Sequence, residues 1–425
     1  MKELIKKNFN KIIIYFIILQ PLFDLITAIA INSFNLNITI GIIIRMAFLI
    51  FIVSTVIFVY NKKKALLYYF PLLIYFLIFL SDVLINKNGN NLFGELQGLL
   101  RTFYFPILLF SFYVIKDELK IGINTLIKAV LIYLLLIFFP MILNIGFNSY
   151  DIAKTGTVGF FNSANEIGAI ISIITPFLFL IIKDKKYLKN VLIFLCYIIV
   201  ILNIGTKTPI LSFSITFFLI LLWIIIKYIK ERRYKAIIVS FISLLLIFIS
   251  IVIFLPKTAF YKNIKIHMDY LEVKSITEIF KEPKLIDHFI FSERLTFLDN
   301  KYKIYEQAPI YEKLVGIGYY NGEKEIKMIE MDYFDIYYSH GLLGFILFFS
   351  IYIYILINTF KNKGKINFIK YIQLISVFLI ILLSLFTGHI ITAPSVSLFV
   401  VIIIFINDKQ ISSVSNLKNK NKFLE

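Results

Sequence analysis

Three carboxylates gather in the stretch EMDYFD, where Glu330, Asp332 and Asp335 precede an apolar run. If this stretch is helical, Glu330 and Asp332 point about 200° apart, because each residue turns a helix by about 100°. Asp332 and Asp335 then share a face. A carboxylate can accept the proton of a sugar hydroxyl as that hydroxyl attacks an anomeric carbon. The cluster therefore predicts a general base, with Glu330 and Asp332 as candidates and Asp335 as a substrate contact.

Four cations are candidates for binding a phosphate. Arg45 and Arg101 interrupt apolar runs, roughly 8–11 Å from the nearer ends of those runs at about 1.5 Å per residue. Lys207 lies in the turn GTKTP, and Arg294 lies in a later polar stretch. Arginine offers forked hydrogen bonds and lysine a compact charge, and a diphosphate accepts both. We predict that these cations bind or stabilise a diphosphate. The alternatives are an ion pair of Arg45 with Asp24, and a solvated turn for Lys207.

Uncharged polar groups add to this set. The segment TGTVGFFNSANEIGA (155–169) is rich in Gly, Asn and Ser, and such a segment can line a sugar groove through Asn162 and Asn165. An ordinary capped helix entry is the alternative. His340 directly follows the acidic cluster and is a further candidate contact. His389, in TGHIITAP, is a lone histidine of the kind that is more often structural.

The chain offers little for metal or nucleotide chemistry. It has 4 histidines and a single cysteine, Cys196, which lies inside an apolar run. Neither a nucleotide-binding glycine loop nor a zinc-protease motif is present. We therefore expect no metal and no cofactor, because a diphosphate is already a good leaving group without one.

The elements that must position these residues are transmembrane helices. The chain has 425 residues, of which 59% are hydrophobic and 16% charged, with a mean hydropathy of +0.85. No soluble fold hides that much apolar surface, so the sequence predicts an all-α polytopic membrane protein. The net charge of +18 would suit nucleic acid. However, the basic residues lie in short clusters between apolar runs, which is the positive-inside pattern and excludes nucleic acid as the expected partner.

Apolar runs long enough to cross a bilayer predict about twelve spans, since a hydrocarbon core of about 30 Å needs about 20 helical residues. The expected spans are 12–31, 38–60, 65–85, 96–115, 122–143, 165–182, 188–204, 209–229, 236–255, 341–360, 370–386 and 390–406.

The charges between these spans predict the orientation. Connections of one parity, with the two termini, hold 26 of the 44 Lys and Arg residues, whereas the short connections of the other parity hold 3. Basic connections stay in the cytoplasm. We therefore expect spans one to nine in residues 1–255, an extracytoplasmic loop at 256–340, the last three spans in 341–406 and a cytoplasmic tail at 407–425. Both termini are then cytoplasmic, and the protein lies in the cytoplasmic membrane.

Several motifs along the whole chain resemble the O-antigen ligase and O-antigen polymerase superfamily. They are FFNSANEIG, then GTKTPIL, then ERLTFLDNKYKIYEQAPIYEKLVGIGYY, followed by the acidic stretch and HGLLGF. The resemblance implies a GT-C-like architecture with one large extracytoplasmic loop. It also implies a polyprenyl-diphosphate-linked glycan as substrate, held in the outer leaflet of the membrane lipid. A flippase and a chain-length regulator are the protein partners that it suggests.

Two departures from the family pattern bear on mechanism. Members of the superfamily usually carry Arg in the turn where this chain has Lys207, and often a Glu or a His-Asn pair where this chain has EMDYFD. The acidic stretch EMDYFD favours a carboxylate base over a histidine base. The arginine of the loop motif corresponds to Arg294.

Three functions remain open at this point. A polymerase would join lipid-linked repeat units, and a ligase would move the finished glycan to a different acceptor. A polysaccharide transporter or flippase would instead need polar groups along a whole path and a midplane site, usually with internal repeats. We expect an enzyme rather than a transporter, because the polar groups gather at one depth and a long polar loop needs a role. Polymerase and ligase share these features. We expect the polymerase because of the family resemblance and because the sequence offers no soluble domain for binding a protein acceptor.

Overall fold

The apolar runs of the sequence form long helices. The computed structural model describes residues 2–34, 39–60, 62–63, 65–87, 89–149, 155–181, 187–235, 238, 253–361 and 367–406. The bundle helices are α1 (Lys2–Phe34), α2 (Ile40–Ser54) with its π-helical continuation η1 (Thr55–Val59), α3 (Ala65–Ile85), α4 (Leu92–Val114), α5 (Ile123–Ile142), α6 (Ala164–Leu178), α7 (Tyr187–Ile204), α8 (Lys207–Lys230), α15 (Asp332–Phe360), α16 (Phe368–Phe386) and α17 (Pro394–Phe405).

Among the described residues, 7 helices are long and apolar enough to cross a membrane, and α6, α7 and α17 are shorter apolar helices. This confirms a helical membrane protein. The total of twelve spans stays a prediction, because the expected span 236–255 lies almost entirely outside the described residues, as do 407–425.

One boundary differs from the expectation. The tenth expected span begins at Gly341, but α15 begins at Asp332. The helix continues across Gly341, whose φ of 61° and ψ of −169° make a kink. A positive φ costs glycine little because it has no Cβ. The acidic cluster therefore belongs to the start of a bundle helix.

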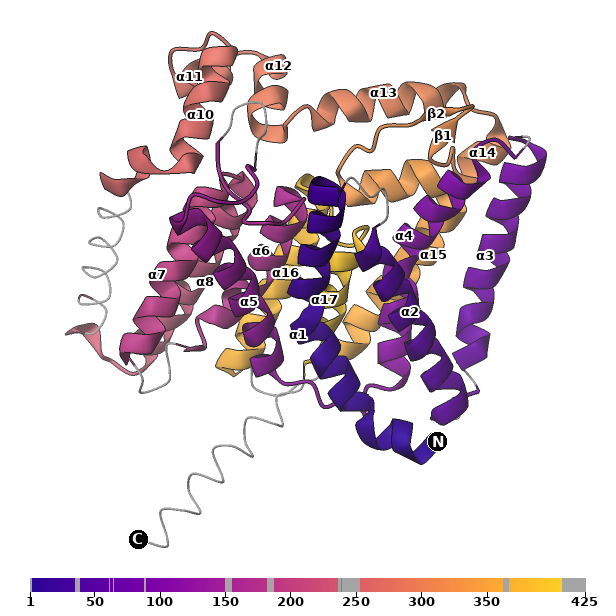
Figure 1. The fold of residues 1–425 in the computed structure, drawn as a ribbon, viewed down its shortest axis with the longest axis horizontal. Helices are drawn as coiled ribbons and strands as arrows, with labels where there is room; N and C mark the ends of the chain where they lie inside the picture. Colours follow the sequence, from indigo (N-terminus) through magenta and orange to yellow (C-terminus); the bar gives the residue numbers. More distant parts are fainter. Residues whose placement is uncertain are drawn as a thin grey trace, which may run out of the picture.

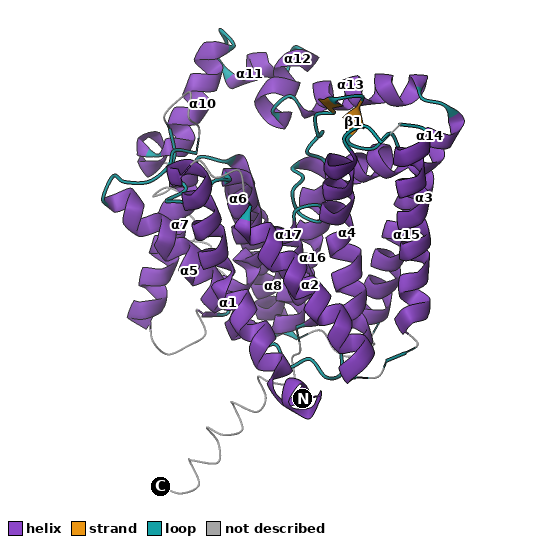
Figure 2. Ribbon diagram, turned by 45° about the vertical axis from the view of Figure 1, so that its right-hand side comes forward, coloured by secondary structure: helices purple, strands orange, loops and turns teal. Residues whose placement is uncertain are grey.

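The polar segment, residues 256–331, folds into short elements over one end of the bundle (Figures 1 and 2). The two strands pair antiparallel, with Tyr320 opposite Glu325. The elements are η3 (Leu255–Lys257), α10 (Ala259–Tyr270), α11 (Ile276–Ile279), α12 (Pro283–Ile286), the π-helix η4 (Asp287–Phe291), α13 (Arg294–Gln307), α14 (Ile310–Val315), β1 (Tyr320–Asn321) and β2 (Lys324–Glu325).

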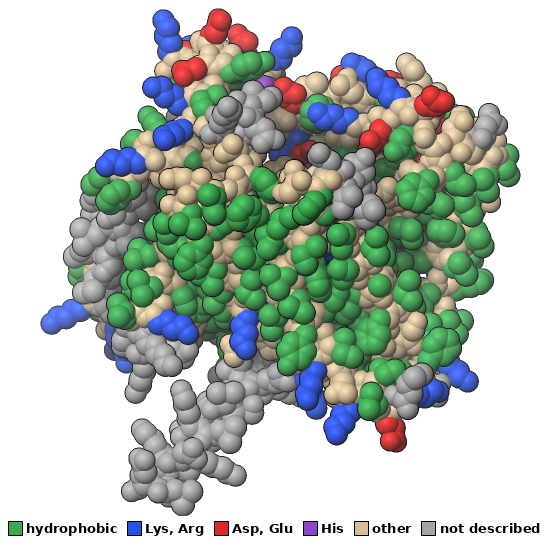
Figure 3. All heavy atoms as spheres, viewed as in Figure 1, with side chains coloured by type: hydrophobic (Ala, Val, Ile, Leu, Met, Phe, Trp, Pro, Cys, Tyr) green, Lys and Arg blue, Asp and Glu red, His purple; other side chains and the backbone are tan. Residues whose placement is uncertain are grey.

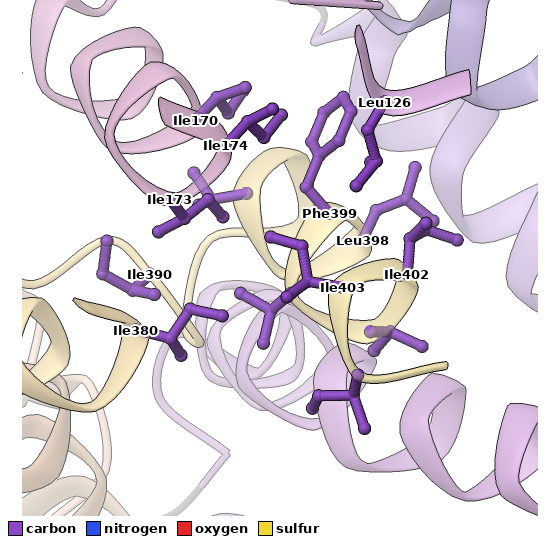
Figure 4. Close-up of a cluster of buried hydrophobic side chains, with 14 of the residues drawn as sticks. Leu126, Ile170, Ile173, Ile174, Ile380, Ile390, Leu398, Phe399, Ile402 and Ile403 are labelled. Carbon is purple, nitrogen blue, oxygen red and sulfur yellow. The ribbon is translucent and has the colours of Figure 1, made fainter. Parts of the chain in front are cut away.

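Helix α17 forms the centre of the bundle. All of its residues from Pro394 to Phe405 are buried. Leu398, Phe399 and Ile403 belong to one buried cluster with Leu126 of α5 and with isoleucines of α6 and α16 (Figure 4). Lipid is as apolar as these side chains, so close packing rather than the hydrophobic effect favours this arrangement. The helix gives the loop that precedes it a rigid base.

The lysine-rich connections lie at one end of the bundle, and the polar segment lies with the α3–α4 connection at the other. At one end Asn10 contacts Glu118, and Lys62 pairs with Glu118 at 3.5 Å. At the other end the polar segment receives hydrogen bonds from Lys87 and Asn91 of the α3–α4 connection. Figure 3 shows mostly basic side chains at the first end, with an acidic one among them, and mixed charges at the second. For these connections, the lysine-rich ones and the others lie at opposite ends of the bundle, as the charges predict.

We predict that the polar segment is extracytoplasmic. Single cysteines replace Ser275 in the polar segment and Lys63 in the α2–α3 connection, in a Cys196→Ser background. An impermeant thiol reagent applied to whole cells should label the first cysteine and spare the second, because the positive-inside rule predicts that the lysine-rich end faces the cytoplasm. Permeabilised cells should show both labelled, which controls for access. Labelling of the Lys63 position in intact cells contradicts the orientation.

Candidate active site

Glu330 lies in the connection just before α15 and faces two cations. Arg294, the first residue of α13, donates from Nη2 to Glu330 Oε2 at 3.1 Å. His389, in the loop between α16 and α17, places Nε2 3.6 Å from the same oxygen. Glu330 Oε1 has no hydrogen-bond partner among the described residues, and the side chain is 31% exposed. One carboxylate oxygen is therefore paired and the other is available.

The charges around Glu330 keep it ionised. Burial alone would raise its pKa, but the close contact with His389 and the charges of His389 and Arg294 lower the pKa of Glu330 to about 2. Burial alone would lower the pKa of His389, whereas the contact with Glu330 and the charge of Glu166 raise it. Each partner thus favours the charged form of the other.

Lys207 extends this group of cations. It is the first residue of α8, and its Nζ donates to the carbonyl oxygen of Phe289 in the polar segment. The same ammonium lies 4.7 Å from the centre of the Phe289 ring, a cation–π geometry. It lies close enough to Arg294 for the two charges to repel each other. Two neighbouring cations that repel form a favourable place for an anion.

A cavity of about 730 Å³ opens beside these cations. Lys207, Arg294 and Asn165 contribute polar groups to it, and η4 and α10 cover it from the polar segment. Its other walls are apolar side chains of α8 and α16. They are Ile210, Leu211, Ile215, Leu382, Leu383 and Phe386. The arrangement is that of an amphipathic pocket, with charge at one side and hydrocarbon at the other.

The outer surface is hollowed near this place, between the α10–α12 projection and the rest of the polar segment, and charged side chains show at the hollow (Figure 3). Arg294 is only 9% exposed, and its Nε has no hydrogen-bond partner among the described residues. A buried guanidinium with a free donor can still bind an anionic ligand.

Arg101 of α4 comes near the same place. Its charge acts on Glu166 of α6 and on His389. Glu166 accepts a hydrogen bond from Ser395 at the start of α17. Arg101 itself has no ion-pair partner within 4.0 Å among the described residues, so it remains available for a ligand at this end of the bundle.

The other predicted residues lie in enclosed contacts. Arg45 pairs with Asp24 and donates to Gln20 at 2.9 Å, which is the ion pair named as the alternative for it. His340 is 0% exposed, and its two ring nitrogens contact the hydroxyls of Tyr75 and Tyr319 at 3.0 and 2.8 Å. These side chains join helices and do not line the cavity.

Asp332 and Asp335 are equally enclosed, at 1% and 3% exposure. Both oxygens of each carboxylate accept hydrogen bonds, from the α16–α17 loop in one case and from residues 329–331 and Lys301 in the other. Asn162 accepts a bond from Asn32 at 3.3 Å on the exposed surface. Of the predicted residues, the structure thus brings Glu330, Arg294, Lys207 and Asn165 together, with Arg101 nearby.

Sequence reasoning did not include His389 in the site. The one signal was its position in a turn at the polar end of the bundle, between two helices. A histidine that meets a carboxylate from a distant segment is visible only once the two loops are placed together.

Comparison of the chain with known proteins gives a match to a family model. A model of the family described as O-antigen ligase like membrane protein matches residues 6–284 and 277–406. No curated protein and no solved structure matches the chain. The match covers most of the chain and implies a membrane glycosyl-transfer enzyme in general, and the chain belongs to the family of O-antigen ligase like membrane proteins.

Proposed function

We propose that the protein polymerises polyprenyl-diphosphate-linked oligosaccharide repeat units at the outer face of the cytoplasmic membrane. The observation that carries the proposal is the free oxygen of Glu330. Of the three clustered carboxylates, only Glu330 keeps an oxygen without a partner among the described residues, and it does so beside Arg294 and the amphipathic cavity. Such a site suits a lipid diphosphate and an attacking hydroxyl.

In the proposed reaction the apolar walls of the cavity hold the prenyl chain, and Arg294 and Lys207 bind the diphosphate. The acceptor hydroxyl attacks the anomeric carbon from the side opposite the diphosphate. A new carbon–oxygen bond forms there, and the bond to the diphosphate oxygen breaks with its electron pair. Glu330 Oε1 takes the hydroxyl proton. The cations stabilise the charge that develops on the leaving group.

The low pKa of Glu330 in the free protein fits a role for the substrate itself. A diphosphate bound at Arg294 adds negative charge beside the carboxylate and competes for its guanidinium partner. Both effects raise the proton affinity of Glu330. Glu330 thus becomes a stronger base when the lipid diphosphate is bound. When the site is empty, Glu330 stays ionised and paired with Arg294.

One consideration favours a polymerase over a ligase that acts on a protein, and a second argues against a transporter. Within the described residues, the polar segment is a layer of short helices and a hairpin, with no separate domain for binding a protein acceptor. The charged residues of the described bundle helices lie mainly toward its ends, which does not favour a transport path through the middle.

The carboxylate prediction concerns Glu330→Gln. Removing the base should lower turnover per folded molecule by about 100- to 10,000-fold. Folded, membrane-inserted protein is quantified first, and transfer is then measured with lipid-linked repeat units. Glu325→Gln, an exposed change in β2, is the matched control and should leave turnover unchanged. Near-normal turnover in Glu330→Gln contradicts the proposed base.

The cation prediction concerns Arg294→Ala and Lys207→Ala. Each should lose about 100- to 1,000-fold in turnover, because each removes a charged donor from the developing anion. Lys303→Ala removes a cation from the exposed side of the same helix as Arg294, and Lys128→Ala removes one from the bundle surface. If the two site variants behave like these two controls, the diphosphate does not bind where we propose.

The third prediction separates polymerase from ligase. Purified enzyme in lipid vesicles, given lipid-linked repeat units alone, should produce a ladder of lengthened products on a gel. The Glu330→Gln enzyme in the same vesicles should not. A preparation that makes no ladder but transfers one glycan to an added lipid or protein acceptor is a ligase.

A further inference from the structure

We infer that Asp332 and Asp335 are positioning residues that clamp the Glu330 connection and the His389 loop together. The geometry stands by itself, and only its consequence for turnover rests on the proposed function. Each carboxylate holds one of the two backbone segments, and both carboxylates belong to the first turn of α15. The two acidic residues beside Glu330 thus serve to place it.

Asp335 holds the segment that carries Glu330. Its carboxylate accepts the backbone N–H groups of Ile329, Glu330 and Met331, at 2.9, 2.8 and 3.3 Å. Lys301 of α13 donates to the same carboxylate at 3.0 Å and is 2% exposed. This is a capping arrangement, in which a side chain inside the first turn reaches back to the free N–H groups before the helix. The ion pair with the buried lysine holds the carboxylate in place.

Asp332 holds the loop that carries His389. Its Oδ2 accepts the N–H groups of Ile390 and Ile391 at 3.0 and 2.9 Å, and its Oδ1 accepts the hydroxyl of Thr392 at 2.6 Å. Three charge-assisted bonds to consecutive residues determine the path of that loop. Because Asp332 follows Glu330 by only two positions, these bonds also fix the loop relative to the connection that carries Glu330.

The two backbones touch where they meet. A Cβ on Gly388 would overlap the carbonyl oxygen of Glu330, so only glycine permits this approach. Glu330 and His389 have φ angles of 63° and 56°, in the left-handed region that non-glycine residues rarely adopt. Strained conformations of this kind persist only when the surroundings hold them. The two carboxylates provide the bonds that hold these two.

The clamp has a consequence that can be measured without turnover. His389 is faced by the carboxylates of Glu330 and Glu166, by the guanidinium of Arg101 and by Asp332 itself. Although burial opposes its protonation, Glu330 and Glu166 raise the pKa of His389 above its ordinary value. If the loop moves away from Glu330, the pKa of His389 must fall, and the imidazole loses its proton at lower pH.

The experiment follows the histidine signals of isotope-labelled protein in nanodiscs as a function of pH. The chain has 4 histidines, and the His389 signal is identified by its loss in His389→Gln. The variants are Asp332→Asn, the milder Thr392→Val, and Asp335→Asn combined with Lys301→Met, which avoids an unpaired buried lysine. Thr392→Val removes one of the three bonds to the loop and tests the clamp if Asp332→Asn does not fold. Thr387→Val, in the same loop but outside the clamp, is the control.

In each folded clamp variant the pKa of His389 should fall. Asp332→Asn should show the larger change because it also removes a carboxylate that faces His389. The smaller fall in Thr392→Val, which leaves every charge in place, reports the movement of the loop. Turnover should drop by about 100-fold in Asp332→Asn, as expected when a reacting group is misplaced by about 1 Å. An unchanged pKa of His389 in folded Thr392→Val overturns the inference. If the wild-type protein transfers no glycan at all, the proposed function fails, and the titration still decides the clamp.

Discussion

A charge inside the bundle needs a partner, because an unpaired ion in a low-dielectric environment costs several kcal/mol. This requirement organises the polar end of the molecule. Arg45 pairs with Asp24 across α1 and α2, and Lys87 pairs with the fully buried Glu95 at 2.8 Å. Lys301 brings α13 onto α15 through Asp335. Each pair joins parts of the chain that would otherwise be held only by non-directional packing.

Cations that lack a full set of partners are informative for the same reason, because a buried charge needs a partner. Lys207 contacts a carbonyl and an aromatic ring but has no described carboxylate within ion-pair distance, and it lies beside a second cation, Arg294. Arg294 is paired through one nitrogen to Glu330. Positive charge is thus left over beside the cavity, where an anionic ligand can complete the pairing. A structural role alone does not account for two neighbouring cations of which only Arg294 has a carboxylate partner among the described residues.

Two buried features hold the elements of this site in position, namely helix α17 and the contacts of His340. Helix α17 is enclosed by other helices, so the loop ahead of it starts from a rigid base (Figure 4). His340 contributes to the frame, since its tyrosine contacts connect α3, α15 and the segment before β1. A group that is enclosed in this way cannot touch substrate, yet it keeps the kink at Gly341 and the start of α15 in register with Glu330. Precision at the site comes from residues outside it.

The sequence by itself determined the class of protein and much of its layout. Apolar runs must be helical in a membrane, since every backbone polar group needs a partner within the segment, and α3 and α16 therefore follow their runs closely. Charge asymmetry separated the two ends of the bundle. The tertiary structure decided which of the clustered carboxylates is free, because Glu330, Asp332 and Asp335 differ in hydrogen-bond partners and hardly in type or position. It also brought His389 to Glu330 and shaped the cavity. Contacts between distant segments depend on how helices pack, and no local pattern of residues encodes them.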